Sequence, residues 1–342
     1  MKKNVRTILQ YLLFLGLGIF FAWLSLKNLD KKSTEQIKQA LVNSRHWLAI
    51  PVFGILIGSH LVRALRWRLL IEPLGYTPSK ANSFFAVMIG YLVNMGVPRM
   101  GEIVKCTVLA RYEKIPADKL VGTIILERMI DALTLLVVFG TTLVIQPELY
   151  TRIMDAFFNN EAEKPEKKLI SQLLPFIIIG VIILLTIVWM LVKKKTVKDL
   201  MSVFRKIYQS IIQGITAIRH LKKRKQFIFY TLLLWIFYLA GGYIGFMAFR
   251  ETEIYGIKEA FTILSAGSIG MIASPGGIGA YAFLIEKTMQ LYGLNATIAA
   301  AFGWILWLAQ TSVILLGGIL SFVALPYFNK KHNHEKGGSH TS

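Results

Sequence analysis

Long apolar runs separated by short polar loops are the dominant pattern of this chain. Residues 8–26 form a run of 19 positions without a charged side chain, and residues 169–192 form one of 24. Both runs exceed the roughly 18 residues that mark a membrane-spanning helix. Together with further mostly apolar stretches over 119–146 and 227–249, the pattern predicts an all-α polytopic membrane protein with about six spanning helices.

Two further apolar stretches finish at breaks that contain glycine and proline. The stretch 81–97 finishes within "NMGVPRMGE" (residues 94–102), and the stretch 260–274 is followed by "PGGIGA" (residues 275–280). After the first stretch only 13 residues precede the basic segment "RYEKIPADK", which is too short for a crossing and a return. We therefore predict two re-entrant helical hairpins, in which about 16 inbound residues reach about 24 Å into a ~30 Å hydrocarbon core.

The two predicted hairpins resemble each other in sequence. At an offset of 177 residues three pairs coincide: Phe84 with Phe261, Gly90 with Gly267, and Pro98 with Pro275. Each hairpin follows one spanning helix and precedes another, and the charge pattern predicts that they enter from opposite sides. Two such units form an inverted repeat, which many transporters use for alternating access.

The composition supports a membrane location. Hydrophobic residues make up 54% of the chain, charged residues 17%, and the mean hydropathy is +0.53. The net charge of +20 raises the question of nucleic acid, but the basic residues cluster in loops between apolar runs. That arrangement follows the positive-inside rule and suits an anionic inner leaflet, so we predict no nucleic-acid partner.

The largest basic cluster fixes the predicted orientation. Residues 193–226 contain eleven Lys or Arg against one acidic residue, which predicts a cytoplasmic location. Apolar residues recur there at steps of three and four, so the segment is either an amphipathic helix in the inner headgroup layer or a helix packed beneath the bundle. Both termini are then predicted to be cytoplasmic.

The predicted organisation is a single transmembrane domain over residues 1–326. Its first half covers about 47–146 and its second half about 227–325, with the basic segment between them. Residues 327–342 are predicted to be a disordered cytoplasmic tail, because they are polar and basic.

The hairpin tips are the first candidate site. Irregular backbone at membrane depth is tolerated where it is buried in protein or lines a wet cavity. Helices that begin after each turn point N–H groups toward the membrane centre, where they favour an anion. The predicted substrate-binding residues are Arg99 as the main cation, Asn94, and the backbone of Gly276, Gly277 and Gly279. Glycine-rich loops that merely end helices in packed loops are the alternative.

The second candidate site is "LERMID" within the span 119–146. Glu127, Arg128 and Asp131 share one helical face by their spacing, and Arg128 can pair with Asp131. Ionised side chains at membrane depth cost a few kcal/mol each and usually face a bundle interior or a water path. The cluster is therefore either a salt bridge that fixes packing or, with Glu102, part of substrate or proton handling.

Basic residues near the inner end of the second helix have a simpler interpretation. Arg63 and Arg66 are expected to be snorkelling anchors, and Arg66 with Trp67 is a secondary candidate for headgroup contact. The chain has one cysteine and no histidine cluster, so no metal or cofactor is predicted.

The ordered motifs resemble a known family. "RALRWRLLIEPLG", "GYLVNMGVPRMGEIVKCTVLARYEKI", "GTIILERMIDAL" and "SPGGIGAYAFLIEKTMQLYGL" follow in the order found in the transmembrane, flippase-like region of lysylphosphatidylglycerol synthases. The resemblance covers about residues 5–325. It implies movement of a phospholipid between the leaflets of the cytoplasmic membrane of a prokaryote. Synthase activity is not implied, since no soluble catalytic domain is expected here. One departure is "FGWILWLAQTS", where members often have an arginine.

The sequence thus predicts a flippase- or scramblase-like carrier of an anionic or phosphate-bearing lipid. It favours a transporter over an enzyme, and a separate lipid-modifying enzyme is an expected partner. The alternatives are a membrane-embedded transferase acting on a lipid-linked or polyprenyl-phosphate substrate, with Glu127 or Asp131 as base, and a small-anion secondary transporter.

Overall fold

The computed structural model describes residues 15–27, 30–97, 99–149, 219 and 221–338, and these residues are helical apart from turns and loops. The chain divides into two compact units, one formed by residues 1–128 and 218–342 and the other by residues 129–217. The described part of the second unit, 129–149, is mostly the continuation of helix α6. The site and the hairpins below lie in the first unit.

Four described helices are long and apolar enough to cross a membrane: His46–Leu74, Ala117–Ile145, Arg224–Ala248 and Ala296–Lys330. They contain α3 (Ala49–Ile71), α6 (Ala117–Ile145), α10 (Arg224–Ala248) and the first part of α13 (Ala296–Gly338). The prediction of an all-α polytopic membrane protein is confirmed. A shorter apolar helix is described over Leu15–Leu26, while the predicted span 169–192 and most of the basic segment 193–226 lie outside the described residues.

Short helices flank these spans or form their ends. Helix α2 (Lys31–Val42) precedes the span His46–Leu74, η1 (His46–Leu48) and η2 (Glu72–Leu74) form the two ends of that span, and η3 (Arg250–Thr252) follows α10. The Asp30 carboxylate caps α2 by accepting a hydrogen bond of 2.7 Å from the Ser33 N–H. This hydrogen bond lowers the pKa of Asp30, because it favours the charged form.

The first hairpin consists of α4 (Lys80–Gly96) and α5 (Met100–Glu113), and three residues join them. The Ser79 hydroxyl caps α4, and the turn places Arg99 in the left-handed region at φ 66°. The two helices approach closely because neither Gly90 nor Gly101 has a side chain at their contact; a Cβ on Gly101 would overlap the Gly90 carbonyl. Small residues are the usual means by which membrane helices pack.

The second hairpin consists of α11 (Ile257–Ala273), the single turn η4 (Pro275–Gly277) and α12 (Ala280–Leu291). Gly276, Gly277 and Gly279 all have positive φ angles, which glycine adopts without steric cost. A Cβ on Gly267 would lie 2.6 Å from the Tyr281 ring. The glycine of α11 that matches Gly90 of α4 therefore also faces the partner helix of its own hairpin.

The order long helix, hairpin, long helix occurs twice, and the boundaries repeat at the offset found in the sequence. Adding 177 to the ends of α4, residues 80 and 96, gives 257 and 273, which are the ends of α11. Adding 177 to the last residue of α3, 71, gives 248, the last residue of α10. The offset therefore holds for helix boundaries as well as for the matched residues.

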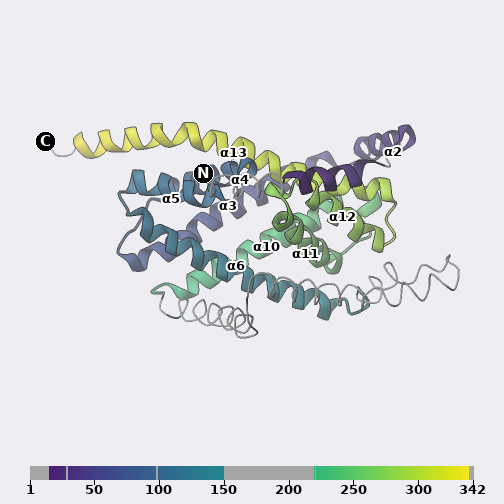
Figure 1. Cartoon of the computed structure of the whole chain (residues 1–342), viewed down its shortest axis with the longest axis horizontal. Helices are drawn as coiled ribbons and strands as arrows, with labels where there is room; N and C mark the ends of the chain where they lie inside the picture. Colours follow the sequence, from purple (N-terminus) through teal and green to yellow (C-terminus); the bar gives the residue numbers. More distant parts are fainter. Residues whose placement is uncertain (1–14, 28–29, 98, 150–218, 220, 339–342) are drawn as a thin grey trace, which may run out of the picture. The chain divides into compact units, whose positions relative to one another are not determined.

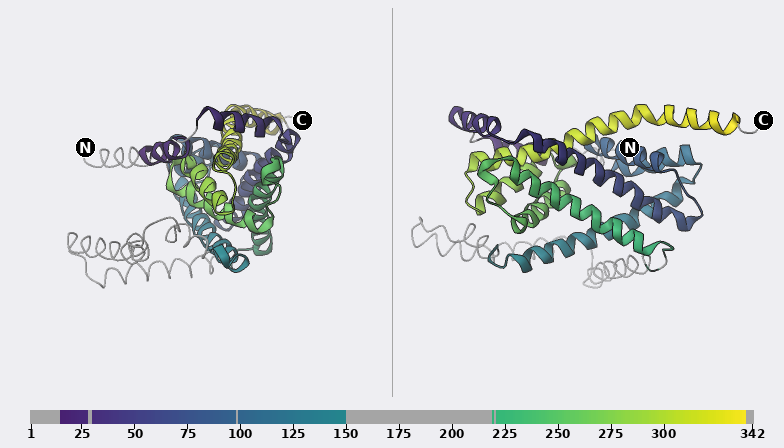
Figure 2. Two further views of the ribbon diagram at one scale, coloured as in Figure 1. Left: turned by 90° about the vertical axis from the view of Figure 1, so that its right-hand side faces the viewer. Right: turned by 180° about the vertical axis from the view of Figure 1, so that it is seen from behind.

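Helices α3 and α10 lie side by side and antiparallel (Figures 1 and 2). At one end Lys223 Nζ lies 2.9 Å from the Glu72 carboxylate, and at the other the Arg45 N–H donates to the Ala248 carbonyl at 2.8 Å. Between them, a Cβ on Gly58 would lie 3.1 Å from the Phe237 ring.

Each hairpin starts and finishes at one end of this pair. In the first hairpin, Asn82 of α4 donates to Glu113 of α5 at 2.6 Å, so both open ends lie together. In the second, Tyr292 after α12 donates to Thr262 of α11 at 2.9 Å. The tips touch, because a Cβ on Gly276 would lie 3.6 Å from Met95 Cα.

Each half has its own apolar core. The first is built around Trp67, Ile71, Val87 and Leu109, and the second is built around Phe246, Ile263, Ile285 and Phe302. Helix α13 also packs on α4, where a Cβ on Gly318 would lie 2.7 Å from Leu92.

The last helix, α13, continues to Gly338 and contains Pro326. No further proline or glycine follows until Gly337. The disordered tail expected over residues 327–342 stays a prediction.

Candidate functional site

A buried carboxylate surrounded by three cations is the main polar feature of the first half. Glu127 of α6 is fully buried. One of its oxygens lies 2.8 Å from Lys105 Nζ of α5, and the other lies 3.2 Å from Arg63 and 3.6 Å from Arg66, both of α3. Glu127 thus joins the long helices α3 and α6 to the outgoing arm of the first hairpin.

Aromatic side chains enclose these charges. The Lys105 ammonium lies 4.5 Å from the centroid of the Trp67 ring, and the indole N–H of Trp67 donates to the Thr123 hydroxyl at 2.8 Å. Arg63 donates to the Tyr238 hydroxyl of α10 at 2.7 Å. Cation–π contacts of this kind are strongest where the cation has lost water, so the rings stabilise charges that lie away from solvent.

The local sequence explains how α3 supplies two arginines. Arg63 and Arg66 are three residues apart, so they lie on one face of the helix. The expectation that they snorkel toward the headgroups is wrong: Arg66 has no exposed surface and Arg63 is 7% exposed. Helix α3 packs against other helices on this face, and Glu127 provides a buried partner that makes the interior position tolerable.

The second predicted headgroup contact is equally buried. Trp67 has no exposed surface, and its N–H is already bound by Thr123. Neither Arg66 nor Trp67 therefore reaches a lipid-facing surface in this conformation.

The remaining residues of the predicted acidic cluster separate into different environments. Arg128 follows Glu127 on α6, but its Nε lies 2.8 Å from Glu102 of α5 at a partly exposed position. Helix geometry explains the separation, because adjacent residues point about 100° apart. Asp131 lies in the second unit and is half-buried.

The first hairpin tip is held by Asn94. Its side-chain oxygen accepts a hydrogen bond of 2.8 Å from the Gly101 N–H, which begins α5. Arg99 is exposed at this tip, and no ion pair joins it to Glu127 within the described residues. Its predicted role as the main cation stays a prediction, while Glu127 is bound by other cations.

The second tip is braced by α13. The Trp307 indole N–H donates to the Gly276 carbonyl at 3.0 Å, and Gln310 donates to the Tyr281 hydroxyl at 2.8 Å. The Gly277 N–H already donates to the Ser274 carbonyl at 3.0 Å. Gly279 lies against the backbone of the helix Leu15–Leu26, so this tip is packed tightly in protein.

The sequence interpretation did not select Lys105 as part of a site. It also placed Arg63 among the anchors, although these two residues and Glu127 form the buried cluster. One available signal was the position of Lys105 within the otherwise apolar segment "IVKCTVLA" of a predicted hairpin arm. A lysine in such a position needs a buried acidic partner.

A second buried carboxylate lies in the other half. Glu286 of α12 is 5% exposed and accepts a hydrogen bond of 2.5 Å from the Ser25 hydroxyl. Lys287 Nζ lies 3.0 Å from it, and the Trp304 indole N–H donates to Ser25 at 3.2 Å. This cluster joins the helix Leu15–Leu26 to the second hairpin and α13.

These features define a class of protein. The chain is a multi-pass α-helical membrane protein with two helical hairpins and a buried carboxylate that lies among three cationic side chains. Guanidinium and ammonium groups bind carboxylate and phosphate through charge-assisted hydrogen bonds, so the cluster around Glu127 has the chemistry to exchange one anion for another.

The comparisons identify the family. The chain belongs to the family described as the lysylphosphatidylglycerol synthase TM region, whose model matches residues 8–318. It is 22% identical over 361 residues to the UPF0104 membrane protein MJ1595 of Methanocaldococcus jannaschii, and the match covers 98% of each chain. No solved structure matches this chain. The resemblance expected from the motifs is thereby confirmed for a lipid-related membrane protein.

Proposed function

We propose that this protein moves an anionic, phosphate-bearing lipid headgroup between the leaflets of the membrane. The observation that carries the proposal is the buried set of Arg63, Lys105 and Glu127, because ionisable residues at membrane depth mark substrate pathways. Membership in a lipid-related family supports lipid as the substrate class.

Glu127 acts as an internal anion in this proposal. In the absence of substrate its carboxylate is the anion that pairs with the cations, at 2.8 Å from Lys105 and at 3.2 Å and 3.6 Å from Arg63 and Arg66. A phosphate that arrives at the cluster replaces the carboxylate, since phosphate binds the same cations. The acyl chains stay in lipid while the headgroup passes through protein.

The arrangement of the hairpins supports alternating access. The hairpins open at opposite ends of α3 and α10, their tips touch at Met95 and Gly276, and the helix boundaries repeat at an offset of 177 residues. We interpret the two halves as an inverted repeat, in which each hairpin closes one side of the pathway. We assign the end that carries Glu72 and Lys223 to the cytoplasmic side, because basic loops favour that side.

Reconstitution tests the proposal. Full-length protein is placed in vesicles with a fluorescent phosphatidylglycerol, and crossing is followed by chemical quenching of the outer leaflet. Lys105→Met should reduce the crossing rate at least tenfold, and Lys258→Met, an exposed lysine on the second hairpin, should leave it unchanged. Equal rates for both variants would remove the cluster from the pathway.

The same vesicles separate the rival functions. Release of a new product from a lipid-linked phosphate donor would support a transferase, and uptake of a soluble phosphate or carboxylate would support a small-anion transporter. Either activity, in the absence of lipid crossing by the unmodified protein, would overturn the lipid proposal.

A further inference from the structure

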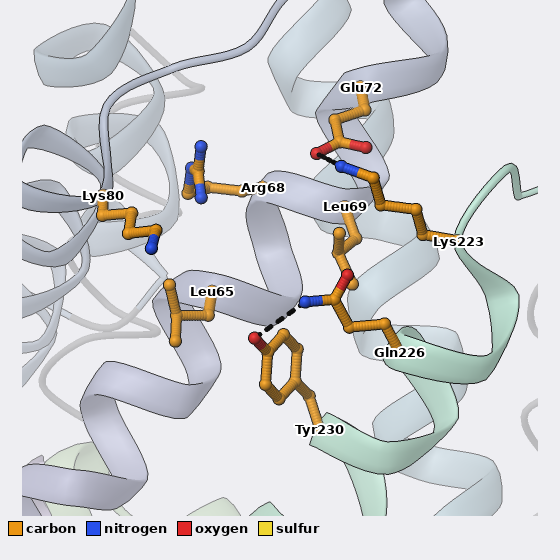
Figure 3. Close-up of a pocket in the computed structure, with 8 residues that line it drawn as sticks. All are labelled: Leu65, Arg68, Leu69, Glu72, Lys80, Lys223, Gln226 and Tyr230. Carbon is orange, nitrogen blue, oxygen red and sulfur yellow. Dashed lines mark hydrogen bonds and ion pairs between the residues drawn. The ribbon is translucent and has the colours of Figure 1, made fainter.

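A separate basic cavity lies at the end of the bundle where α3 finishes and α4 and α10 begin. It has a volume of about 260 Å³. Its polar lining comes from Arg68 of α3, Glu72 of η2, Lys80 of α4, Lys223 just before α10, and Gln226 and Tyr230 of α10 (Figure 3). The cavity is thus lined by the first half, through α3 and α4, and by the second half, through α10. Its lining does not include Glu127 or Lys105.

The cavity carries an excess of positive charge. Arg68, Lys80 and Lys223 supply three positive charges and Glu72 supplies one negative charge, which gives +3 − 1 = +2. Lys223 pairs with Glu72 at 2.9 Å and keeps 55% of its side chain exposed. No ion pair joins Lys80 to another residue in the part of the chain that the structure describes.

Local structure fixes the cations around the cavity. Arg68 Nε donates to the Pro78 carbonyl at 2.7 Å, which holds the guanidinium beside the loop before α4. Lys80 is the first residue of α4, where a positive charge opposes the helix dipole. Helix stability therefore does not account for a lysine at this position, whereas an anion in front of the helix would be favoured by both the N-terminus and the lysine.

The position of the cavity identifies the source of its ligand. Apolar spans begin or end at its rim, so it lies at the level of the headgroups, and the basic loops assign this end to the cytoplasmic leaflet. Basic pockets between helices on that side suit anionic headgroups. The volume is smaller than the roughly 300–1,000 Å³ of pockets for drug-sized ligands, which suits a headgroup rather than a whole lipid.

We propose that this cavity binds the phosphate group of an anionic headgroup from the cytoplasmic leaflet. Arg68 and Lys80 bind the phosphate directly, and Lys223 joins them when the phosphate displaces Glu72. The step deepens the proposed function and rests on it, since the cavity is then the place where the headgroup first binds before it reaches the Glu127 cluster. The binding itself can be measured without transport.

Lipid binding to the full-length protein in neutral phosphatidylcholine discs provides the test. Phosphatidylglycerol is titrated in, and bound lipid is counted by native mass spectrometry. The double variant Lys80→Gln/Lys223→Gln should weaken binding about tenfold or more, since each substitution removes a charge-assisted hydrogen bond to the phosphate. The control Lys222→Gln/Lys225→Gln removes the same charge from two exposed lysines beside the cavity and should change the affinity less than about threefold.

A single substitution that should strengthen binding distinguishes direct phosphate binding from a purely structural role of these residues. Glu72→Gln removes the internal competitor of the phosphate and should strengthen binding several-fold, whereas loss of structure would weaken it. Inorganic phosphate is titrated in parallel without phosphatidylglycerol: binding that depends on Lys80 and Lys223 would keep the phosphate site but assign it to a soluble anion.

Equal losses in both double variants, or weaker binding in Glu72→Gln, would overturn the proposal. The outcome is separable from transport. If the unmodified protein moves no lipid but the double variant weakens binding, the site stands and the transport proposal fails. If lipid crosses normally in the double variant and its binding is unchanged, the site fails and transport stands.

Discussion

Lys105 Nζ lies 2.8 Å from a Glu127 oxygen, and this ion pair joins the first hairpin to the long helix that follows it. Both side chains are buried, at 5% and 0% exposure. In a water-poor interior an isolated charge costs several kcal/mol. If the Glu127 carboxylate moves away, Lys105 therefore needs another anion or water in its place. The contact is a structural link between the hairpin and α6, and in the proposed function it is the place where an anionic headgroup competes with Glu127 for Lys105.

Removing the Glu127 charge should destabilise the protein strongly. Glu127→Gln keeps the size of the side chain but leaves Lys105, Arg63 and Arg66 without this carboxylate, which should cost about 3–5 kcal/mol. Thermal unfolding in detergent measures the change. The control Glu102→Gln affects an ion pair whose side chains are 42% and 32% exposed, and it should cost about 1 kcal/mol or less. Similar losses for the two variants would contradict the burial of the cluster.

Close packing within the first hairpin predicts a large effect at Gly101. An added Cβ overlaps the Gly90 carbonyl and lies 2.6 Å from the Asn94 side chain, so Gly101→Ala should destabilise by about 1–3 kcal/mol. It should also reduce lipid crossing, because α4 and α5 must move apart to accommodate the added methyl group, which displaces the hairpin tip. Gly122→Ala is the matched control, since no atom lies within 4 Å of its added Cβ. A helical glycine in open space should gain up to about 1 kcal/mol on this change.

Arg99 allows the effect of strain to be separated from the effect of charge. Its φ of 66° costs about 1–2 kcal/mol for a residue with a Cβ. Arg99→Gly should therefore raise the free energy of unfolding by about 1 kcal/mol, while Arg99→Ala should leave it nearly unchanged. If the guanidinium holds the headgroup between the tips, both variants lose crossing at least tenfold. Normal crossing in both would exclude Arg99 from the pathway.

The helices and hairpins could be predicted because their signals are local. Long apolar runs predict spans, because the thickness of the bilayer sets the length of a spanning helix. Pro98 and Pro275, with the glycines beside them, mark the breaks between the hairpin arms. The predicted stretch 81–97 differs from α4 (Lys80–Gly96) by one residue at each end. The second stretch, 260–274, begins three residues later than α11 (Ile257–Ala273) and ends one residue later.

The composition of the buried cluster could not be predicted in the same way. Whether Arg63 and Arg66 face headgroups or protein depends on which helix packs against α3, and that is a tertiary contact. The ion pair between Arg128 of α6 and Glu102 of α5 is also a tertiary contact, so the spacing within α6 could not predict it. The sequence predicted Glu127 at membrane depth but could not predict which cations surround it.

The contact between the hairpin tips gives the sharpest test of alternating access. The ideal Cβ of residue 276 lies 3.9 Å from Met95 Cβ, within the range of about 3.5–4.5 Å found in disulfides. Met95→Cys with Gly276→Cys, in a Cys106→Ala background that removes the one native thiol, should therefore form a cross-link under mild oxidation. The link should stop lipid crossing, because the tips can no longer part, and reduction should restore it. Gly276→Cys places a Cβ at a φ of 59° and should cost about 1–2 kcal/mol, so the crossing rate of each single cysteine variant, with and without oxidant, is the reference for the cross-linked protein. A cross-linked protein that still moves lipid would show that the tips stay together during transport, and alternating access by separation of the hairpins would then be wrong.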